Sequence, residues 1–358
     1  MIPDDSRFEN DPDEVLDEHV LPEGWYVEGV DTDRDLDRLV ELLRQHEEAG
    51  RGWAGAGPDD VLVEVSPRAE LMRANVVVRD PDGVLRAWGS VHDRAAGRMM
   101  FLHVVDRELE GRDAVRVSTV LFDWARAQAR EVGAARGLAV QQIDTGAFAN
   151  DDRQQLWLSR AGFERVRTWW QMTRAVRPDE ADLVTEPAGW RDGPLTVRLV
   201  RRGADGMPEE DDLRAVHDVL EAAFADHFNS HEETFDEFVH RLREDPGHRW
   251  DHWWLAELTD EGATVPVGAL VGTHVESADG PDGSYVAYIG VLGTARGRGV
   301  AKGLLHTVIA DAASRGRDRV GLEVDADSPT GADGLYTALG WETRYVTESW
   351  HLDVPTTD

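Results

Sequence analysis

A glycine-rich turn is the part of this sequence whose residue types most directly indicate chemistry. Residues 290–301 read Gly-Val-Leu-Gly-Thr-Ala-Arg-Gly-Arg-Gly-Val-Ala and follow an apolar run typical of a strand. Glycine lets a backbone turn tightly, and the next segment predicts a helix, whose first N–H groups favour an anion. The spacing fits neither the phosphate loop of nucleoside triphosphatases nor the dinucleotide-binding turn. It therefore predicts a different phosphate-binding turn.

The turn resembles the signature of the GCN5-related N-acetyltransferase (GNAT) family, Gln/Arg-x-x-Gly-x-Gly/Ala, which Arg296, Gly299 and Ala301 match. The resemblance implies that the backbone amides of residues 297–301 hold the pyrophosphate of acetyl-CoA. It also implies that the main chain of residues 289–292 pairs with the pantetheine arm like an added strand. The cofactor-binding residues implied are Ile289, Gly290, Val291, Leu292, Arg296, Gly297, Arg298, Gly299, Val300 and Ala301. Lys302, the only lysine of the chain, is either a further phosphate ligand or a solvated side chain.

Residues 324–341 resemble a second segment of the same family, Asn-x-x-(x)-Ala-x-x-Leu-Tyr-x-x-x-Gly-Phe. The resemblance makes Tyr336 the acid that protonates the departing CoA thiolate, which a phenol can do when both groups share a dry cleft. Ser328 stands where many members have Asn, so a hydroxyl replaces the amide that often contacts the cofactor. The other interpretation of Tyr336 is an aromatic side chain packed under the sheet.

Several residues are candidates for the base that removes a proton from the acceptor amine. Glu323 ranks first, because the strand predicted over residues 319–325 lies beside the strand that leads into the turn and places Glu323 on one face with Gly321 and Asp325. The expected oxyanion donors are backbone N–H groups around Val291 and Leu292. The alternatives are a water relay or side chains elsewhere: His227, His231, Glu232, Glu233, His274 and Glu276. The histidines lack a matching carboxylate frame, so we expect no metal.

The elements that must position these residues recur twice along the chain. From residue 195 the pattern predicts a strand, two helices, three strands, a helix, a strand, a helix and a final strand. Residues 25–174 follow the same order, with helices over 36–48 and about 114–132. The segments 161–164 and 339–342 align at an offset of about 178 residues. We therefore predict an internal duplication.

The resemblance and the duplication together define a fold class and a division of the chain. The fold class is α/β, as two tandem GNAT folds, each a mostly antiparallel mixed sheet flanked by helices. A Pro-containing segment without apolar period separates the copies. We predict an acidic tail over residues 1–22, a degenerate copy over 23–176, a linker over 177–194 and a catalytic copy over 195–358.

The first copy has lost the residues that the resemblance assigns to chemistry. Its turn, residues 104–118, reads Val-Val-Asp-Arg-Glu-Leu-Glu-Gly-Arg-Asp-Ala-Val-Arg-Val-Ser, with a single glycine and acidic residues where a phosphate would lie. Leu158 stands at the position of Tyr336, although Asn150 is retained at the position of Ser328. We expect this copy to pack against the catalytic one and to shape the acceptor cleft.

Composition excludes several function classes. The 358 residues include 70 Asp and Glu against 38 Lys and Arg, a formal net charge of −32, which opposes binding to nucleic acid or to an anionic membrane. The absence of cysteine excludes disulfides and a thiol nucleophile. No basic leader or long apolar run is present, so a cytoplasmic location is expected. The sequence leaves a monomer and a homodimer open.

These observations favour an acetyl-CoA-dependent N-acetyltransferase that acts on a small-molecule amine. Three alternatives remain open: acetylation of protein N-termini or lysines, a non-catalytic module that binds acyl-CoA, and transfer of a longer acyl chain from its thioester.

Overall fold

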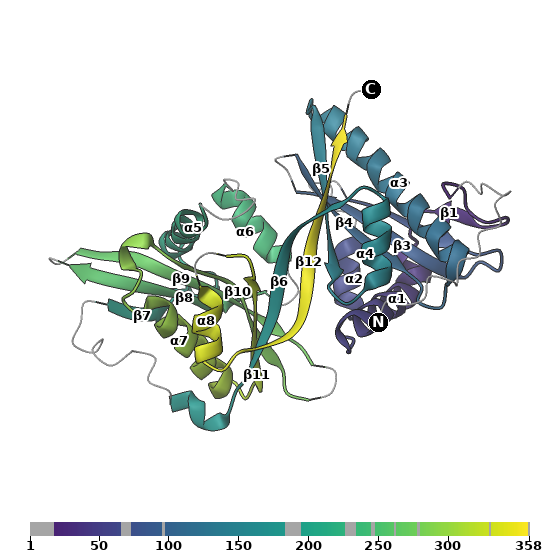
Figure 1. Ribbon diagram of the computed structural model, residues 1–358. Coiled ribbons are helices and arrows are strands. Elements are labelled where there is room, and N and C mark those ends of the chain that lie inside the picture. Colours follow the sequence, from purple (N-terminus) through teal and green to yellow (C-terminus); the bar gives the residue numbers. More distant parts are fainter. Residues whose placement is uncertain are drawn as a thin grey trace.

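The computed structural model describes residues 18–65, 73–94, 97–182, 195–225, 234–244, 248–260, 263–277, 280–328 and 331–356. Its strands form one sheet in the order β1-β2-β3-β4-β5-β12-β6-β11-β10-β9-β8-β7, which runs through the whole molecule (Figure 1). Two of its ladders are parallel, β4 with β5 and β10 with β11, and the others are antiparallel. The predicted class, a mostly antiparallel mixed sheet with helices, is confirmed.

The first half of the chain supplies six strands and four helices within the described residues. They are β1 (Tyr26–Glu28), α1 (Thr32–Arg51), α2 (Pro58–Val65), β2 (Arg73–Arg79), β3 (Leu85–Asp93), β4 (Arg98–Val105), α3 (Gly111–Ala135), β5 (Val140–Phe148), α4 (Asp152–Arg160) and β6 (Glu164–Ala175). The sequence pattern did not predict α2. With it, this half follows the complete order expected of the second half.

The second half repeats the order. Its elements are β7 (Leu195–Leu199), α5 (Glu210–Phe224), α6 (Phe235–Glu244), β8 (His248–Asp260), β9 (Ala263–Val275), β10 (Gly283–Val291), α7 (Val300–Ser314), β11 (Arg319–Asp325), α8 (Ala332–Ala338) and β12 (Glu342–Pro355), with a short 3-10 turn at Gly293–Ala295. Between the halves, the described part of the expected linker includes a 3-10 helix at Pro178–Asp182. Its Glu180 is buried and pairs with Arg174. Linker residues 183–194 lie outside the described residues.

The halves exchange their last strands. β12, at the end of the second half, lies between β5 and β6 of the first, and β6 in turn pairs with β11 of the second half (Figure 1). In register, Glu323 of β11 faces Gln171 of β6, and Gln171 faces Tyr345 of β12. Residues of both halves therefore meet at the centre of the sheet.

Each half is covered by helices on both faces of the sheet. In the second half, α7 and α8 pack over a core that includes Val300, Leu304 and Tyr336, while the opposite core includes Leu220 of α5 and Phe238 of α6. Strand β8 shows why its sequence is a continuous apolar run: Trp253 belongs to one core and Trp254 to the other, because side chains alternate between faces. Val300, at the start of α7, is buried in the first of these cores and packs against Gly268 of β9.

Candidate functional site

The glycine-rich turn lies between the end of β10 and the start of α7, as the sequence predicted. Gly297 and Gly299 have φ angles of +74° and +82°, a left-handed conformation that strains any residue with a side chain. Gly299 is the N-cap of α7, and no side chain caps this helix. Its first-turn N–H groups have no partner within the helix, so they can bind an anion.

Two cations flank this helix start. The side chains of Arg296 and Lys302 are both exposed, and neither forms an ion pair within the part of the chain that the structure describes. Arg298 is exposed on the same turn. In a chain with a net charge of −32, this arrangement creates a local positive site beside the free N–H groups.

Strand β10 separates from β11 before it reaches the turn. The two strands pair from Gly283 to Val286, where a bulge follows, whereas β10 stays paired with β9 as far as Val291. Such a gap exposes main-chain groups on one edge of β10, as the resemblance requires for a pantetheine arm. Gly290 has a packing role here: a Cβ would lie 2.9 Å from Cβ of Ala223 on α5.

One of the two expected oxyanion donors is not available. The N–H of Leu292 donates to the carbonyl of Val267 on β9, at 2.9 Å. Because neighbouring N–H groups of a strand point to opposite edges, the N–H of Val291 faces the gap instead. Sequence alone could not decide which edge each residue of β10 presents.

Tyr336 lies on α8, on the same side of the sheet as the turn. Its ring is buried, packs edge-on against Trp341 at 6.2 Å and belongs to the same core as Ala295 and Val300. Burial raises the pKa of Tyr336 to about 12, so the phenol stays protonated at neutral pH. No hydrogen bond to its hydroxyl occurs among the described residues. Ser328 follows β11, where its N–H donates to the carbonyl of Asp325 at 3.2 Å.

Glu323 lies on the other face of the sheet. Its neighbours Leu322 and Val324 point into the α7 core, so Glu323 shares its face with Gly321, as its strand pattern predicted. The side chain as a whole is exposed. Protein atoms around its carboxyl group nevertheless displace water, and this desolvation raises the pKa of Glu323. The amide of Gln171 opposes this shift and the charge of Asp325 adds to it. Tyr336 and Glu323 thus lie on opposite faces of the sheet.

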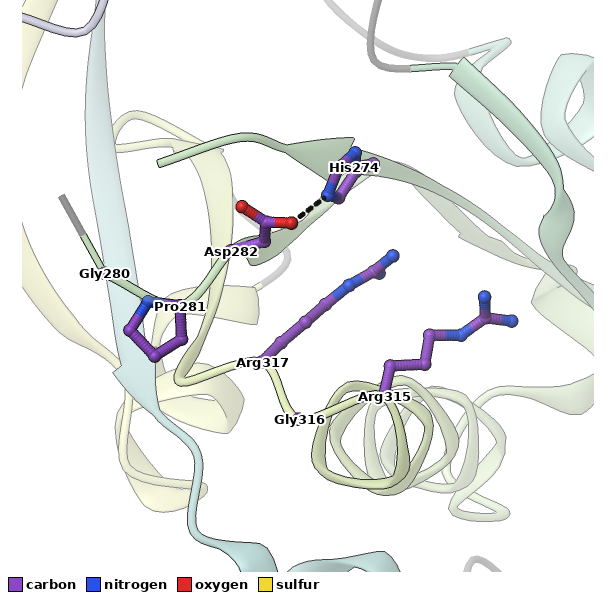
Figure 2. A pocket seen from close by; sticks show the side chains of 7 residues that line it. All are labelled: His274, Gly280, Pro281, Asp282, Arg315, Gly316 and Arg317. Atoms are coloured by element: carbon purple, nitrogen blue, oxygen red, sulfur yellow. Dashed lines mark hydrogen bonds and ion pairs between the residues drawn. The ribbon is translucent and has the colours of Figure 1, made fainter. Parts of the chain in front are cut away.

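The remaining base candidates lie elsewhere. His274 on β9 stands opposite Ser284, at the start of β10 and therefore far from the turn. Its Nε2–H donates to the carboxylate of Asp282 at 2.8 Å, and the ring lines a cavity of about 400 Å³ (Figure 2). Glu276 is exposed just beyond the end of β9. His227, His231, Glu232 and Glu233 fall outside the described residues.

The cavity beside His274 is lined by a cluster of charged side chains. Arg315 and Arg317 reach into it alongside the His274–Asp282 pair (Figure 2). Arg315 is held by Asp251 at 2.8 Å and by Asp311 at 2.9 Å. Arg317 instead donates to the ring of His252 at 2.6 Å and to the hydroxyl of Ser284 at 2.8 Å. Both arginines thus already have partners within the protein. Among the residues described, no cluster of His, Asp and Glu could hold a metal ion.

Gln171 and Tyr285 are site residues that the sequence did not point to. The Gln171 amide donates to the carboxylate of Glu323, and Tyr285 packs against Gly321, next to Glu323 on the same face. Burial raises the pKa of Tyr285, and the charge of Glu323 raises it further. Both residues sit in ordinary strand patterns, and only the pairing of the strands brings them to the site.

Comparisons with known proteins agree with this geometry. A model of the Acetyltransferase (GNAT) family matches residues 214–341. A mycothiol acetyltransferase of Frankia casuarinae is 34% identical, over 90% of this chain and 96% of that protein. One of Thermobispora bispora is also 34% identical, over 59% of this chain and 66% of that protein.

Solved structures show the same fold. A GCN5-related N-acetyltransferase from Sphaerobacter thermophilus has a TM-score of 0.71 at 24% identity, covering 94% of this chain and 98% of that one. A tandem GNAT protein from the clavulanic acid biosynthesis pathway has a TM-score of 0.65 at 14% identity, covering 93% and 100%. In the described part of the chain, no helix has the length and apolar character needed to cross a membrane. The chain belongs to the GNAT acetyltransferase family, with two copies of the fold in tandem.

Proposed function

We propose that this protein transfers the acetyl group of acetyl-CoA to the amine of a small molecule, and that the chemistry takes place in the second half. The observation that carries the proposal is the turn from Arg296 to Lys302. It combines two left-handed glycines, an uncapped helix start and two cations without ion pairs in the described structure. These are the features that a pyrophosphate group requires.

The residues present fit acetyl-CoA, which would supply an acetyl group activated as a thioester. The N–H groups at the start of α7, with Arg296 and Lys302, would hold its phosphates. The free edge of β10 at Ile289 and Val291 would bind the pantetheine arm in the manner of a strand. Where the strands separate, the N–H of Val291 would donate to the thioester oxygen as negative charge develops there.

Two side chains would transfer the protons of the reaction, one as a base and one as an acid. Glu323 would accept a proton from the ammonium group of the acceptor, since only a neutral amine has a free lone pair. Its raised pKa favours this exchange by making the carboxylate more basic than an ordinary one. Tyr336 would donate the proton that the CoA sulfur needs when the carbon–sulfur bond breaks. Its burial keeps the phenol protonated until then.

A small acceptor is favoured over a protein by two observations. The relatives in Frankia casuarinae and Thermobispora bispora are named mycothiol acetyltransferases. In addition, the first half lies against the face of the sheet that carries Glu323: Tyr345 packs on Trp53 at 5.3 Å, and its hydroxyl is 3.4 Å from Arg51. Such a neighbour narrows the approach for a folded polypeptide.

The test is a thiol-release assay with acetyl-CoA and two panels of acceptors, small amines and peptides. We expect turnover with at least one small amine and none with peptide N-termini or lysines. Turnover with peptides alone would shift the assignment to protein acetylation. In parallel, CoA should raise the melting temperature, because a ligand that binds only the folded state stabilises it. CoA stabilisation without turnover on any acceptor would favour a binding module.

A further inference from the structure

Gln171 connects the first half of the chain to the candidate base of the second. It lies on β6, which the strand exchange places between β12 and β11, directly opposite Glu323 in register. Its side-chain amide nitrogen donates to the Glu323 carboxylate and, at 3.2 Å, approaches the hydroxyl oxygen of Thr347 on β12. One amide thus ties together three neighbouring strands.

In the part of the chain that the structure describes, no cation forms an ion pair with Glu323. The charged group that acts on Glu323 is Asp325 of its own strand, and Arg167 of β6 lies beside that aspartate, at 3.9 Å. Tyr285 of β10 shares the face of Glu323, and its pKa is influenced by Tyr288 and Tyr345. The hydroxyl of Tyr345 lies 3.4 Å from Arg51 of α1. The amide of Gln171 is therefore the donor that holds this carboxylate in place.

We propose that Gln171 is a positioning residue for Glu323, so that the first half contributes directly to the acetyl-transfer site although it carries no cofactor turn of its own. The inference rests on the proposed function. A fixed donor on one carboxylate oxygen restricts the rotation of the side chain and leaves the other oxygen to face the acceptor. In the proton step, the carboxylate would take one proton from the acceptor ammonium group and later release it to water. The freed lone pair would form the new nitrogen–carbon bond while the carbon–sulfur bond breaks, and the second proton lost by the nitrogen would replace the one that Tyr336 gives to the CoA sulfur.

The amide also sets the acidity of the base. Desolvation and the charge of Asp325 raise the pKa of Glu323, and the hydrogen bond from Gln171 lowers it. Removal of the amide must therefore raise this pKa further. With a higher pKa, Glu323 stays protonated up to a higher pH. It can therefore act as a base only above that pH.

The experiment compares Gln171→Leu with a matched control, Gln142→Leu. Gln142 lies on β5, and its amide bonds to His351 of β12 at 2.8 Å, so it also links the two halves across the exchanged strands, without touching Glu323. We expect Gln171→Leu to lower kcat/KM about tenfold and to move the acid limb of the kcat/KM profile to higher pH. Gln142→Leu should leave both unchanged, and CoA affinity should be retained in both variants.

A second readout does not need turnover. In protein labelled with ¹³C at glutamate carboxyl groups, the signal lost in Glu323→Gln identifies Glu323, and its titration should move upward in Gln171→Leu. Gln171→Asn should restore part of the effect. An acid limb or a titration that is the same in Gln171→Leu as in Gln142→Leu overturns the inference while the proposed function stands. An acid limb that survives in Glu323→Gln overturns it as well. A wild-type protein without any transfer activity would instead refute the proposed function.

Discussion

The two halves share one order of elements and one gap in the sheet, yet only the second half keeps the gap open. In both, the parallel ladder that precedes the gap is short: β4 pairs with β5 only from Arg98 to Met100, and β10 with β11 only from Gly283 to Val286. Beyond it, the second half presents the edge of β10 and an uncapped helix. The first half fills the corresponding space with its own side chains.

Side chains bridge the gap of the first half directly. The hydroxyl of Thr145 donates to the carbonyl of Phe101 at 2.7 Å, and Arg153 donates to the carbonyl of Val105 at 3.0 Å, at the end of β4. His103 stacks on Phe122 at 4.6 Å. The carbonyl groups that a pantetheine arm would need are therefore already satisfied.

The cations near the two turns also differ: they are paired with carboxylates in the first half and unpaired in the second. In the first half, Arg107 donates to the buried carboxylate of Asp151 at 3.2 Å, and Arg38 binds the fully buried Asp106 at 2.7 Å. In the second half, Arg296 and Lys302 are exposed and without ion pairs in the described structure. The comparison teaches that the second half leaves cations and N–H groups unpaired, as the phosphate site that we propose requires, whereas the first half turns the corresponding groups into internal pairs.

The largest effect is expected when the same negative charge is placed at the start of α7 and, separately, at the start of α3. Gly299→Glu puts a carboxylate where the phosphates would bind and forces a side chain into a φ of +82°. We expect CoA binding to fall by at least ~100-fold, which is about 2.7 kcal/mol. Gly111→Glu is the control, since Gly111 begins α3 with a φ of +57°. Titration calorimetry should show unchanged CoA binding in this variant, and a loss there would mean that the first half binds CoA.

A pair of arginine substitutions should separate stability from binding. Arg107→Met leaves the Asp151 carboxylate buried without its cation, so we expect a loss of about 3 kcal/mol in the free energy of unfolding in urea. CoA affinity should stay the same. Arg296→Met should do the reverse, with weaker CoA binding and unchanged stability. Equal effects of the two substitutions on CoA affinity would contradict the division of roles between the halves.

Tyr336→Phe removes a hydroxyl and leaves the packing of the ring. We expect kcat to fall about 100-fold with little change in CoA affinity, because the acid is needed only when the thiolate departs. Since the pKa of Tyr336 is about 12, its phenol is protonated up to pH 10, and the variant should keep the wild-type pH profile below that value. Leu158→Met, at the corresponding position of α4, should leave kcat unchanged. A normal rate in Tyr336→Phe would assign the acid to another group.

The smallest expected effect concerns the first helical turns. Lys302→Gln should weaken CoA binding about threefold at low salt, and the difference should shrink as salt screens the exposed charge. Arg112→Gln in the first turn of α3 should have no effect at any salt concentration. A salt-independent loss in Lys302→Gln would point to a structural rather than an electrostatic role.

Much of the site could be predicted because it is local in sequence. Arg296, Gly299 and Tyr336 lie in two short segments, and the glycine φ angles and the helix start follow from those residues themselves. The duplication was also visible, since element order depends on periodicity. The sequence did not predict α2, because a helix of eight residues, Pro58–Val65, contains too few turns for a clear periodic pattern.

The sequence by itself therefore determined the family, the order of the elements and the place of the glycine-rich turn for which we propose CoA binding. Only the tertiary structure decided that the halves exchange strands, that Leu292 turns its N–H to β9, and that Gln171 reaches Glu323 across 152 residues. The reason is physical. Strand pairing joins distant segments edge to edge, and the choice of partner depends on the packing of the whole sheet rather than on the residues of either strand.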